Sequence, residues 1–115
     1  MNVLTLAFMG DAIWTMLVRQ YVVAQNDLKI GALNKKANEL VCAKAQALIF
    51  DKIKPFLTQK EIEIANRARN TKKNTVAKNA TIAEYAKSTS LEAVIGYNYL
   101  TGNMKRIQEI WRKSK

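Results

Sequence analysis

The sequence predicts an all-α fold, a bundle of five to seven helices, and three observations favour it. Only four glycines and one proline occur among 115 residues, too few for the many tight turns of an all-β domain. Alanine, lysine, leucine, isoleucine and glutamate dominate, and these residues favour helices. Apolar residues recur at helical spacing, and two capping-box motifs mark helix starts. At this length we expect a single domain spanning residues 1–115.

The first helix is predicted from Val3 to Ala24. Apolar residues at helical spacing form a stripe along it: Leu6, Met9, Ile13, Leu17 and Tyr21. Phe8, Ala12 and Trp14 add apolar surface elsewhere, so this helix must be central or bury a second face against a partner chain. Because Asp11 and Arg19 interrupt the run and no basic leader precedes it, we expect neither a membrane span nor a signal peptide.

The middle of the chain contains two predicted helices with a short segment between them. The second helical region runs from about Leu33 to Phe50, and a further short segment ends at Lys54, because a residue before proline avoids helical geometry. Thr58 to Glu61 form a capping box that opens a third helix, which runs to about Arg69. Residues 70–80 show no helical periodicity, so we interpret them as a loop.

The last third of the chain is predicted to hold three short helices. Thr81 to Glu84 form the second capping box and start the first of them. The polar run 88–90 (Ser-Thr-Ser) is predicted to cap a separate helix from about Leu91 to Leu100. Gly102 then ends that helix, and Asn103 caps the last one, which extends through Arg112.

The composition excludes several classes of catalyst. The chain has 19 Lys and Arg, 9 Asp and Glu, no histidine, and a net charge of +10. Without histidine there is no Ser-His-Asp or Cys-His nucleophile and no common zinc hydrolase site. Cys42 is the single cysteine, so it forms no intramolecular disulfide, and it fits a reducing, cytoplasmic setting. A catalyst here must use carboxylates, lysines, hydroxyls or a hard metal ion held by oxygen.

Two carboxylates stand beside glycines in apolar stretches. Asp11 follows Gly10, and Glu92 lies one helical turn before Gly96. Taken singly, Asp11 is an exposed residue or a partner of Arg19, and Glu92 is a first-turn residue that favours the helix dipole. Taken as a pair on facing helices, they would hold Mg²⁺ or Mn²⁺ with water at the other positions. Each glycine would then allow close approach of a backbone or a ligand.

A basic segment without acidic residues separates the two carboxylates. Residues 59–115 carry a net charge of +7, against +3 for residues 1–58. Such a run is often a solvated loop. A basic, amide-rich loop also suits contacts to phosphates and 2′-hydroxyls, and the absence of aromatic residues favours a duplex over a single strand. The charged residues are Arg67, Arg69, Lys72, Lys73 and Lys78.

Four motifs in order resemble the ribonuclease III family. The run 6–12 (Leu-Ala-Phe-Met-Gly-Asp-Ala) resembles the signature helix of the catalytic domain, and 91–100 (Leu-Glu-Ala-Val-Ile-Gly-Tyr-Asn-Tyr-Leu) resembles the second acidic motif. The run 43–47 (Ala-Lys-Ala-Gln-Ala) and the run 67–72, continuing to 78–79, are similar to the short subclass called Mini-ribonuclease III. Together the motifs cover nearly the whole chain.

The resemblance implies an all-α homodimer, with the signature helix at the two-fold interface, that cleaves double-stranded RNA. It implies dependence on Mg²⁺, with Mn²⁺ as a possible substitute, Asp11 and Glu92 as catalytic residues at the metal, and a metal that activates water. The short subclass processes the ends of 23S ribosomal RNA precursors and lacks a separate double-stranded-RNA-binding domain. The RNA-binding residues carried over are Arg67, Arg69, Asn70, Lys72, Lys73, Lys78 and Asn79.

The chain departs from the family pattern at a few positions. Ala7 and Thr89 stand where full-length members carry a Glu and an Asp, and the short subclass shares both differences. Ala68 and Ala77 stand where the short subclass usually has Gly and Pro, which would alter the shape of the basic loop. The family also carries more residues before the signature helix, so we expect a short N-terminal piece to be absent.

Two other functions remain open from the residues. One is a non-catalytic RNA-binding module, such as a ribosome-assembly protein. The other is a dimerising domain for an acidic protein partner. The RNA-binding module has no use for Asp11 and Glu92 on apolar helices, and metal-dependent cleavage of duplex RNA would exclude both functions.

Overall fold

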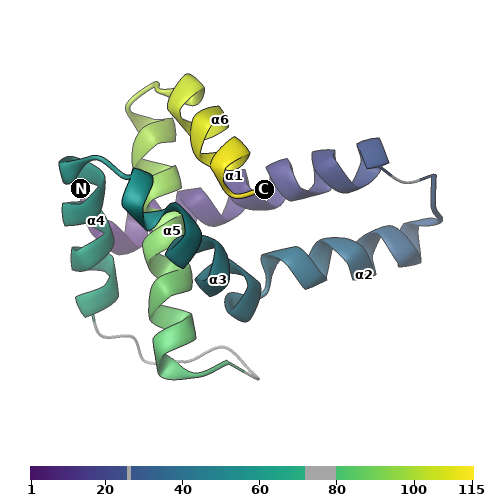
Figure 1. Cartoon of the computed structure of the whole chain (residues 1–115), viewed down its shortest axis with the longest axis horizontal. Coiled ribbons are helices and arrows are strands. Elements are labelled where there is room, and N and C mark those ends of the chain that lie inside the picture. The colour runs from purple at the N-terminus through teal and green to yellow at the C-terminus, as the bar shows by residue number, and fades with distance from the viewer. Residues whose placement is uncertain (26, 72–79) are drawn as a thin grey trace.

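The computed structural model describes residues 1–25, 27–71 and 80–115, and over these ranges it contains helices and no strand. The all-α prediction is therefore confirmed. A short 3₁₀ turn, η1, follows the third α-helix. In chain order the elements are α1 (Val3–Gln25), α2 (Ile30–Val41), α3 (Ala43–Ile53), η1 (Lys54–Phe56), α4 (Gln59–Asn70), α5 (Ile82–Leu100) and α6 (Met104–Lys113), as Figure 1 shows.

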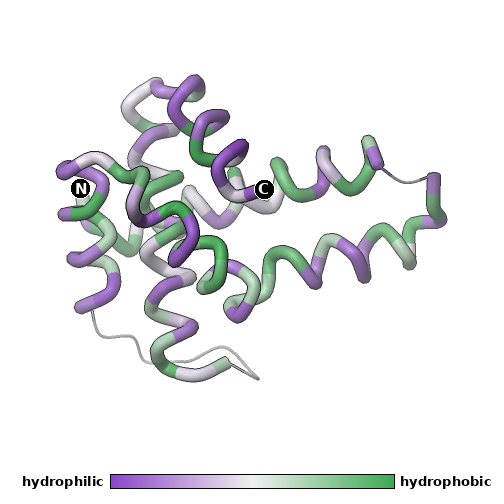
Figure 2. The backbone as a smooth tube through the Cα atoms, in the orientation of Figure 1, coloured by the Kyte–Doolittle hydropathy of each residue, from purple (hydrophilic) through white to green (hydrophobic). Residues whose placement is uncertain are grey.

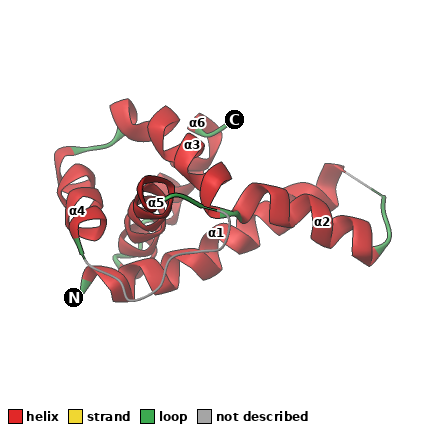
Figure 3. Cartoon of the chain, turned by 90° about the horizontal axis from the view of Figure 1, so that it is seen from below, coloured by secondary structure: helices red, strands yellow, loops and turns green. Residues whose placement is uncertain are grey.

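Helix α5 is the centre of the bundle. Figure 3 shows it nearly end-on, with α1, α3, α4 and α6 arranged around it. Leu91, Ala93, Val94 and Ile95 on α5 are completely buried, because α1, α3 and α4 each pack against it. The C-terminal part of α1 and the antiparallel α2 extend together away from this body (Figure 1).

Helix α1 is buried on one side and exposed on another. Leu6, Ile13 and Leu17 of the predicted stripe are buried, whereas Tyr21 is 38% exposed. Trp14 is fully buried, and its ring meets that of Trp111 on α6 edge-on, with the centroids 5.0 Å apart. In Figure 2 the helices α4 and α6 alternate polar and apolar bands, as expected for helices with one buried side. The exposed apolar side chains of α1 have no such explanation within one chain; they include Phe8, Met16 and Val23.

The predicted helical region from Leu33 to Phe50 is in fact two helices. Cys42 has extended backbone angles (φ −67°, ψ 157°), so α2 ends before it and α3 starts after it. The Cys42 amide still donates to the Asn38 carbonyl, and its own carbonyl accepts from the Gln46 amide. Both backbone groups of Cys42 are therefore paired, and its angles lie in a region that any residue adopts, so the break needs neither glycine nor proline.

The predicted break before Leu91 is absent, and α5 is one helix from Ile82 to Leu100. The prediction was wrong because Ser88, Thr89 and Ser90 do not cap a helix start. Ser88 Oγ donates to Gln46 Oε1 on α3, and Ser90 Oγ donates to the Ala65 carbonyl on α4 at 2.7 Å. These hydroxyls therefore join neighbouring helices and leave the backbone of α5 in helical geometry.

The predicted starts of α4, α5 and α6 are confirmed, whereas α2 starts at Ile30, three residues before the predicted Leu33. Thr58 and Glu61 form a reciprocal capping box at α4, and Thr81 and Glu84 form another at α5. Asn103 Oδ1 accepts from the Arg106 amide at 3.2 Å and caps α6. The preceding turn uses Gly102 at φ 77°, a region that side chains disfavour.

The predicted loop over residues 70–80 lies mostly outside the described residues. Its first member, Asn70, still belongs to α4. Of the helices in the described ranges, none has the length and hydropathy that a membrane span requires.

Candidate functional site

The site is built on a crossing of α1 and α5 at which two glycines allow backbone contact. A Cβ atom on Gly10 would lie 1.7 Å from the carbonyl oxygen of Glu92, and one on Gly96 would lie 1.8 Å from that of Leu6. Any side chain would therefore push the helices apart. The sequence-based expectation that both glycines permit close approach is confirmed, and the approach is between backbones.

The pairing of residues at this crossing brings the backbones of Asp11 and Glu92 close together. Gly10 lies against Glu92, and Leu6, one turn earlier on α1, lies against Gly96, one turn later on α5. These contacts therefore occur in opposite order along the two helices. Asp11 directly follows Gly10, so its backbone lies one residue from the point where α1 contacts Glu92.

The two carboxylates differ in exposure. Asp11 is exposed, and no ion pair joins it to Arg19 among the described residues, so the exposed alternative is confirmed. Glu92 is half-buried. Since α5 starts at Ile82, Glu92 lies in the middle of a helix, and its interpretation as a first-turn residue was wrong.

The chemistry of these donors fits a hard divalent cation. Mg²⁺ in proteins is commonly held by one or two carboxylates, with water completing its shell. Asp11 is exposed and Glu92 is half-buried, so solvent reaches the first of these side chains fully and the second in part. In the described part of the chain no group of three His, Cys, Asp or Glu side chains could hold a metal, so a site here would depend on these two carboxylates.

The basic residues divide between a helix and the part of the chain that is not described. Arg67, Arg69 and Asn70 are exposed on the last turns of α4. Lys72, Lys73, Lys78 and Asn79 lie outside the described residues, as does Ala77. Ala68 is only 1% exposed and belongs to the core, so its methyl group fills space between helices instead of shaping a loop.

A hydrogen bond between α4 and α5 sets the level of the exposed arginines. Ser90 Oγ donates to the Ala65 carbonyl, so Ala65 on α4 lies opposite Ser90 on α5. Glu61 on α4 lies opposite Asn98 on α5, so the two helices run in opposite directions. Arg67 and Arg69 therefore lie beyond Ser90 toward the start of α5, whereas Glu92 lies on the other side of Ser90 along that helix.

Sequence reasoning missed one polar cluster, which lies at the other end of α4. Glu61 was recognised only as a capping residue, yet its carboxylate is 2% exposed and pairs with Arg106 on α6. Asn98 on α5 also donates to it at 2.9 Å. Burial raises the pKa of Glu61, but hydrogen bonds from Arg106, Thr58 and Asn98 outweigh burial and lower it overall. No spacing rule links positions 61, 98 and 106, so the sequence carried no signal for this cluster.

Comparison with known proteins identifies similar sequences over nearly the whole chain. The family model for the ribonuclease III domain matches residues 4–103. A Mini-ribonuclease 3 from Clostridium tetani is 42% identical over 113 residues, covering 97% of this chain and 75% of that protein. A Mini-ribonuclease 3 from Brevibacillus brevis is 44% identical over 109 residues, covering 95% and 81%.

A solved structure agrees with the fold. The crystal structure of a protein from Fusobacterium nucleatum matches with a TM-score of 0.87 at 40% sequence identity. The match covers 95% of this chain and 87% of that one. The chain thus belongs to the ribonuclease III family, within it to the Mini-ribonuclease 3 group, and is an endoribonuclease of the ribonuclease III type.

Proposed function

We propose that this endoribonuclease is Mg²⁺-dependent and specific for double-stranded RNA, and that it matures the ends of 23S ribosomal RNA precursors. The observation that carries the proposal is the glycine crossing, which sets Asp11 beside the segment that bears Glu92. A carboxylate on an apolar helix lowers stability unless its charge is compensated. Two such carboxylates near one helix crossing are explained if both bind the same cation.

Asp11 and Glu92 would hold the cation. When bound, Mg²⁺ would activate water and stabilise charge on the phosphate. The half-buried Glu92 is the more constrained of the two side chains, and the exposed Asp11 is the more accessible to substrate. The chain has no histidine that could act as a general base, which agrees with a reaction in which the carboxylates orient the reacting groups.

Arg67, Arg69 and Asn70 would bind the RNA backbone together with Lys72, Lys73, Lys78 and Asn79. The described members of this set are exposed on the last turns of α4, toward the start of α5. Contacts to phosphates favour a regular duplex and give little sequence preference. A ribosomal RNA precursor as substrate implies a cytoplasmic enzyme.

The enzyme would act as a homodimer formed along α1. Phe8 is 81% exposed and Val23 is 61% exposed on this helix. A shallow groove of about 480 Å³ runs along α1, lined mainly by Ala12, Thr15, Met16, Arg19, Gln20 and Val23. Packing against a second copy would bury this surface, and two-fold symmetry would present one site to each antiparallel RNA strand.

The test is cleavage of a labelled RNA duplex with and without Mg²⁺, for the unmodified protein and for Asp11→Asn. We expect metal-dependent cleavage that the substitution abolishes, with the circular dichroism spectrum and RNA binding retained. Full activity of Asp11→Asn with Mg²⁺ would contradict the role of this carboxylate. Binding without cleavage by the unmodified protein would support the rival function, a non-catalytic RNA-binding module.

A further inference from the structure

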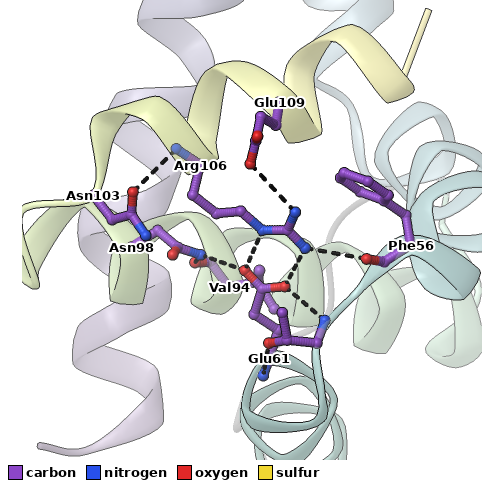
Figure 4. A network of polar contacts seen from close by, with 8 residues as sticks. Phe56, Glu61, Val94, Asn98, Asn103, Arg106 and Glu109 are labelled. Carbon is purple, nitrogen blue, oxygen red and sulfur yellow. Dashed lines mark hydrogen bonds and ion pairs between the residues drawn. The ribbon is translucent and has the colours of Figure 1, made fainter.

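A buried carboxylate at the start of α4 joins four elements of the fold. Glu61 Oε1 accepts from the Thr58 amide at 2.9 Å and from Arg106 Nη2 at 2.6 Å, and Oε2 accepts from Arg106 Nε at 2.9 Å. Oε2 also accepts from Asn98 Nδ2 at 2.9 Å. Arg106 in addition donates to the Phe56 carbonyl of η1 at 3.1 Å (Figure 4). Each carboxylate oxygen thus accepts two hydrogen bonds.

This arrangement specifies position more than it adds stability. A buried ion pair recovers little net energy after its desolvation cost, but the fork of an arginine on a carboxylate allows only one geometry. The Arg106 guanidinium also lies over the Phe56 ring, 4.3 Å from its centroid, which limits its own movement. Glu61 is therefore held at one point relative to α6, η1 and α5.

The cluster and the Ser90 hydrogen bond together fix α4 against α5 at two points. Glu61 meets Asn98, and Ala65, one turn later, meets Ser90. Ser90, Val94 and Asn98 recur every four residues, so they form one stripe on α5, the side that faces α4. Glu92 and Gly96 lie on another side, against α1. Helix α5 thus contacts α1 on one side, at the crossing that includes Glu92, and holds α4 in position on another side.

We propose that Glu61 is a positioning residue, whose bonds to Arg106 and Asn98 set the register of α4 on α5 and thereby the placement of RNA held at Arg67 and Arg69 relative to Glu92. This inference rests on the proposed function, since it requires those arginines to bind RNA. Glu61 itself is buried and does not contact substrate. A shift of α4 would leave the arginines exposed and able to bind, but the phosphodiester bond would be misplaced. Loss of positioning therefore reduces cleavage more than binding.

The experiment compares two variants, Glu61→Gln and Asn98→Ala, with the unmodified protein. Asn98→Ala removes one donor and leaves the Glu61–Arg106 ion pair, so it remains informative if Glu61→Gln fails to fold. Single-turnover cleavage is measured with Mg²⁺, and duplex RNA affinity is measured with Ca²⁺, at a temperature where circular dichroism shows each variant folded. We expect cleavage at least 10-fold slower and a Kd within 3-fold of the unmodified protein.

The matched control is Ile110→Val, which removes one methyl group from a fully buried side chain of α6 outside the cluster. It should lower Tm but leave both the cleavage rate and Kd within 3-fold. The proposal is overturned if Asn98→Ala cleaves as fast as this control. It is also overturned if affinity and cleavage fall in parallel, because that pattern indicates a general loss of structure.

A second readout separates this inference from the proposed function. If the unmodified protein fails to cleave duplex RNA, the proposed function fails, and amide hydrogen exchange still reports the register of α4. Faster exchange in Asn98→Ala confined to Gln59–Asn70, with α1 unchanged, supports the positioning role. Equal acceleration throughout the protein contradicts it.

Discussion

Gly10 and Gly96 lie opposite each other where α1 crosses α5, and a methyl group at either position would overlap a backbone atom. At Gly10 the nearest atom to such a methyl would be the Glu92 carbonyl oxygen, 1.7 Å away, and at Gly96 it would be the Leu6 carbonyl oxygen, 1.8 Å away. Backbone atoms cannot move aside as a flexible side chain can. The two glycines therefore fix the distance between the helices that carry Asp11 and Glu92.

Replacing Gly96 with alanine should separate α1 from α5. Overpacking a core costs about 1–3 kcal/mol and sometimes more, and we expect a loss at the upper end of that range or a failure to fold. Gly31→Ala is the matched control, because no atom lies within 4 Å of the added methyl and the residue is exposed in α2. That variant should be neutral or gain up to about 1 kcal/mol from helix propensity. Urea unfolding measures both, and equal effects of the two substitutions would contradict the close crossing.

Replacing Arg67 and Arg69 together with alanine should weaken RNA binding with little effect on folding, since both side chains are exposed on α4. For each phosphate that a side chain no longer neutralises, the slope of log Kd against log salt falls by about 0.7–0.9. For two arginines we therefore expect a slope smaller by about 1.5 and weaker binding to every duplex sequence. Filter binding over a range of KCl concentrations tests this, with Lys35→Ala on α2 as the control. An unchanged slope would remove the α4 arginines from the RNA interface.

The ion pair of Glu61 and Arg106 should make stability depend on pH in the acid range. Because the pKa of Glu61 is lowered in the folded protein from its ordinary value of 4.5, its contribution is complete above that value and is lost as the pH falls below it. Arg106→Leu leaves a buried charge without its partner, so at pH 7 we expect a loss of about 3–5 kcal/mol. The difference from the unmodified protein should shrink toward pH 3, as protonation of the carboxyl removes the charge that Arg106 compensates.

The exposed pair of Lys87 and Asp51 provides the comparison for that prediction. Its atoms are 2.9 Å apart, but the side chains are 37% and 51% exposed. Lys87→Leu should therefore cost no more than about 1 kcal/mol, with little change between pH 7 and pH 5. Urea unfolding over pH 3–7 measures both substitutions. A loss in Arg106→Leu that stays constant over this range would show that Glu61 is not the titrating group.

The local signals of the sequence were sufficient for most of the fold. Both capping boxes and the Asn103 cap could be recognised because each depends on residues three positions apart. The break at Cys42 could not, since its extended backbone angles are open to any residue and no glycine or proline marks it. The continuity of α5 was missed because a sequence signal for a break was present where the helix has none. Ser88 and Ser90 have the composition of a cap, but their hydroxyls bond to α3 and α4, which are distant in sequence.

Local sequence patterns also predicted some residues of the candidate site and missed others. Asp11 and Glu92 stood out because each is a carboxylate near a glycine in an apolar stretch, and the sequence indicated that each glycine allows close approach of a backbone or a ligand. That the two glycines meet at one crossing is seen only in the structure. The Glu61 cluster had no such signature. Its members come from α4, α5 and α6, and only the tertiary structure brings positions 61, 98 and 106 together. Contacts that set the register between helices join residues far apart in the sequence, so local sequence patterns do not reveal them.

Replacing Phe8 with glutamate should dissociate the proposed homodimer and leave the single chain folded. The side chain is 81% exposed on α1, so a charge there costs little in an isolated chain, whereas burying that charge at a two-fold interface would bring two carboxylates together. Sedimentation at several protein concentrations should show the unmodified protein at twice the chain mass of 13.0 kDa and the variant at the chain mass. Ile82→Glu is the control, because Ile82 is 78% exposed at the start of α5 and lies away from the α1 groove. If Phe8→Glu keeps the mass of the unmodified protein while Ile82→Glu lowers it, the dimer uses a different surface.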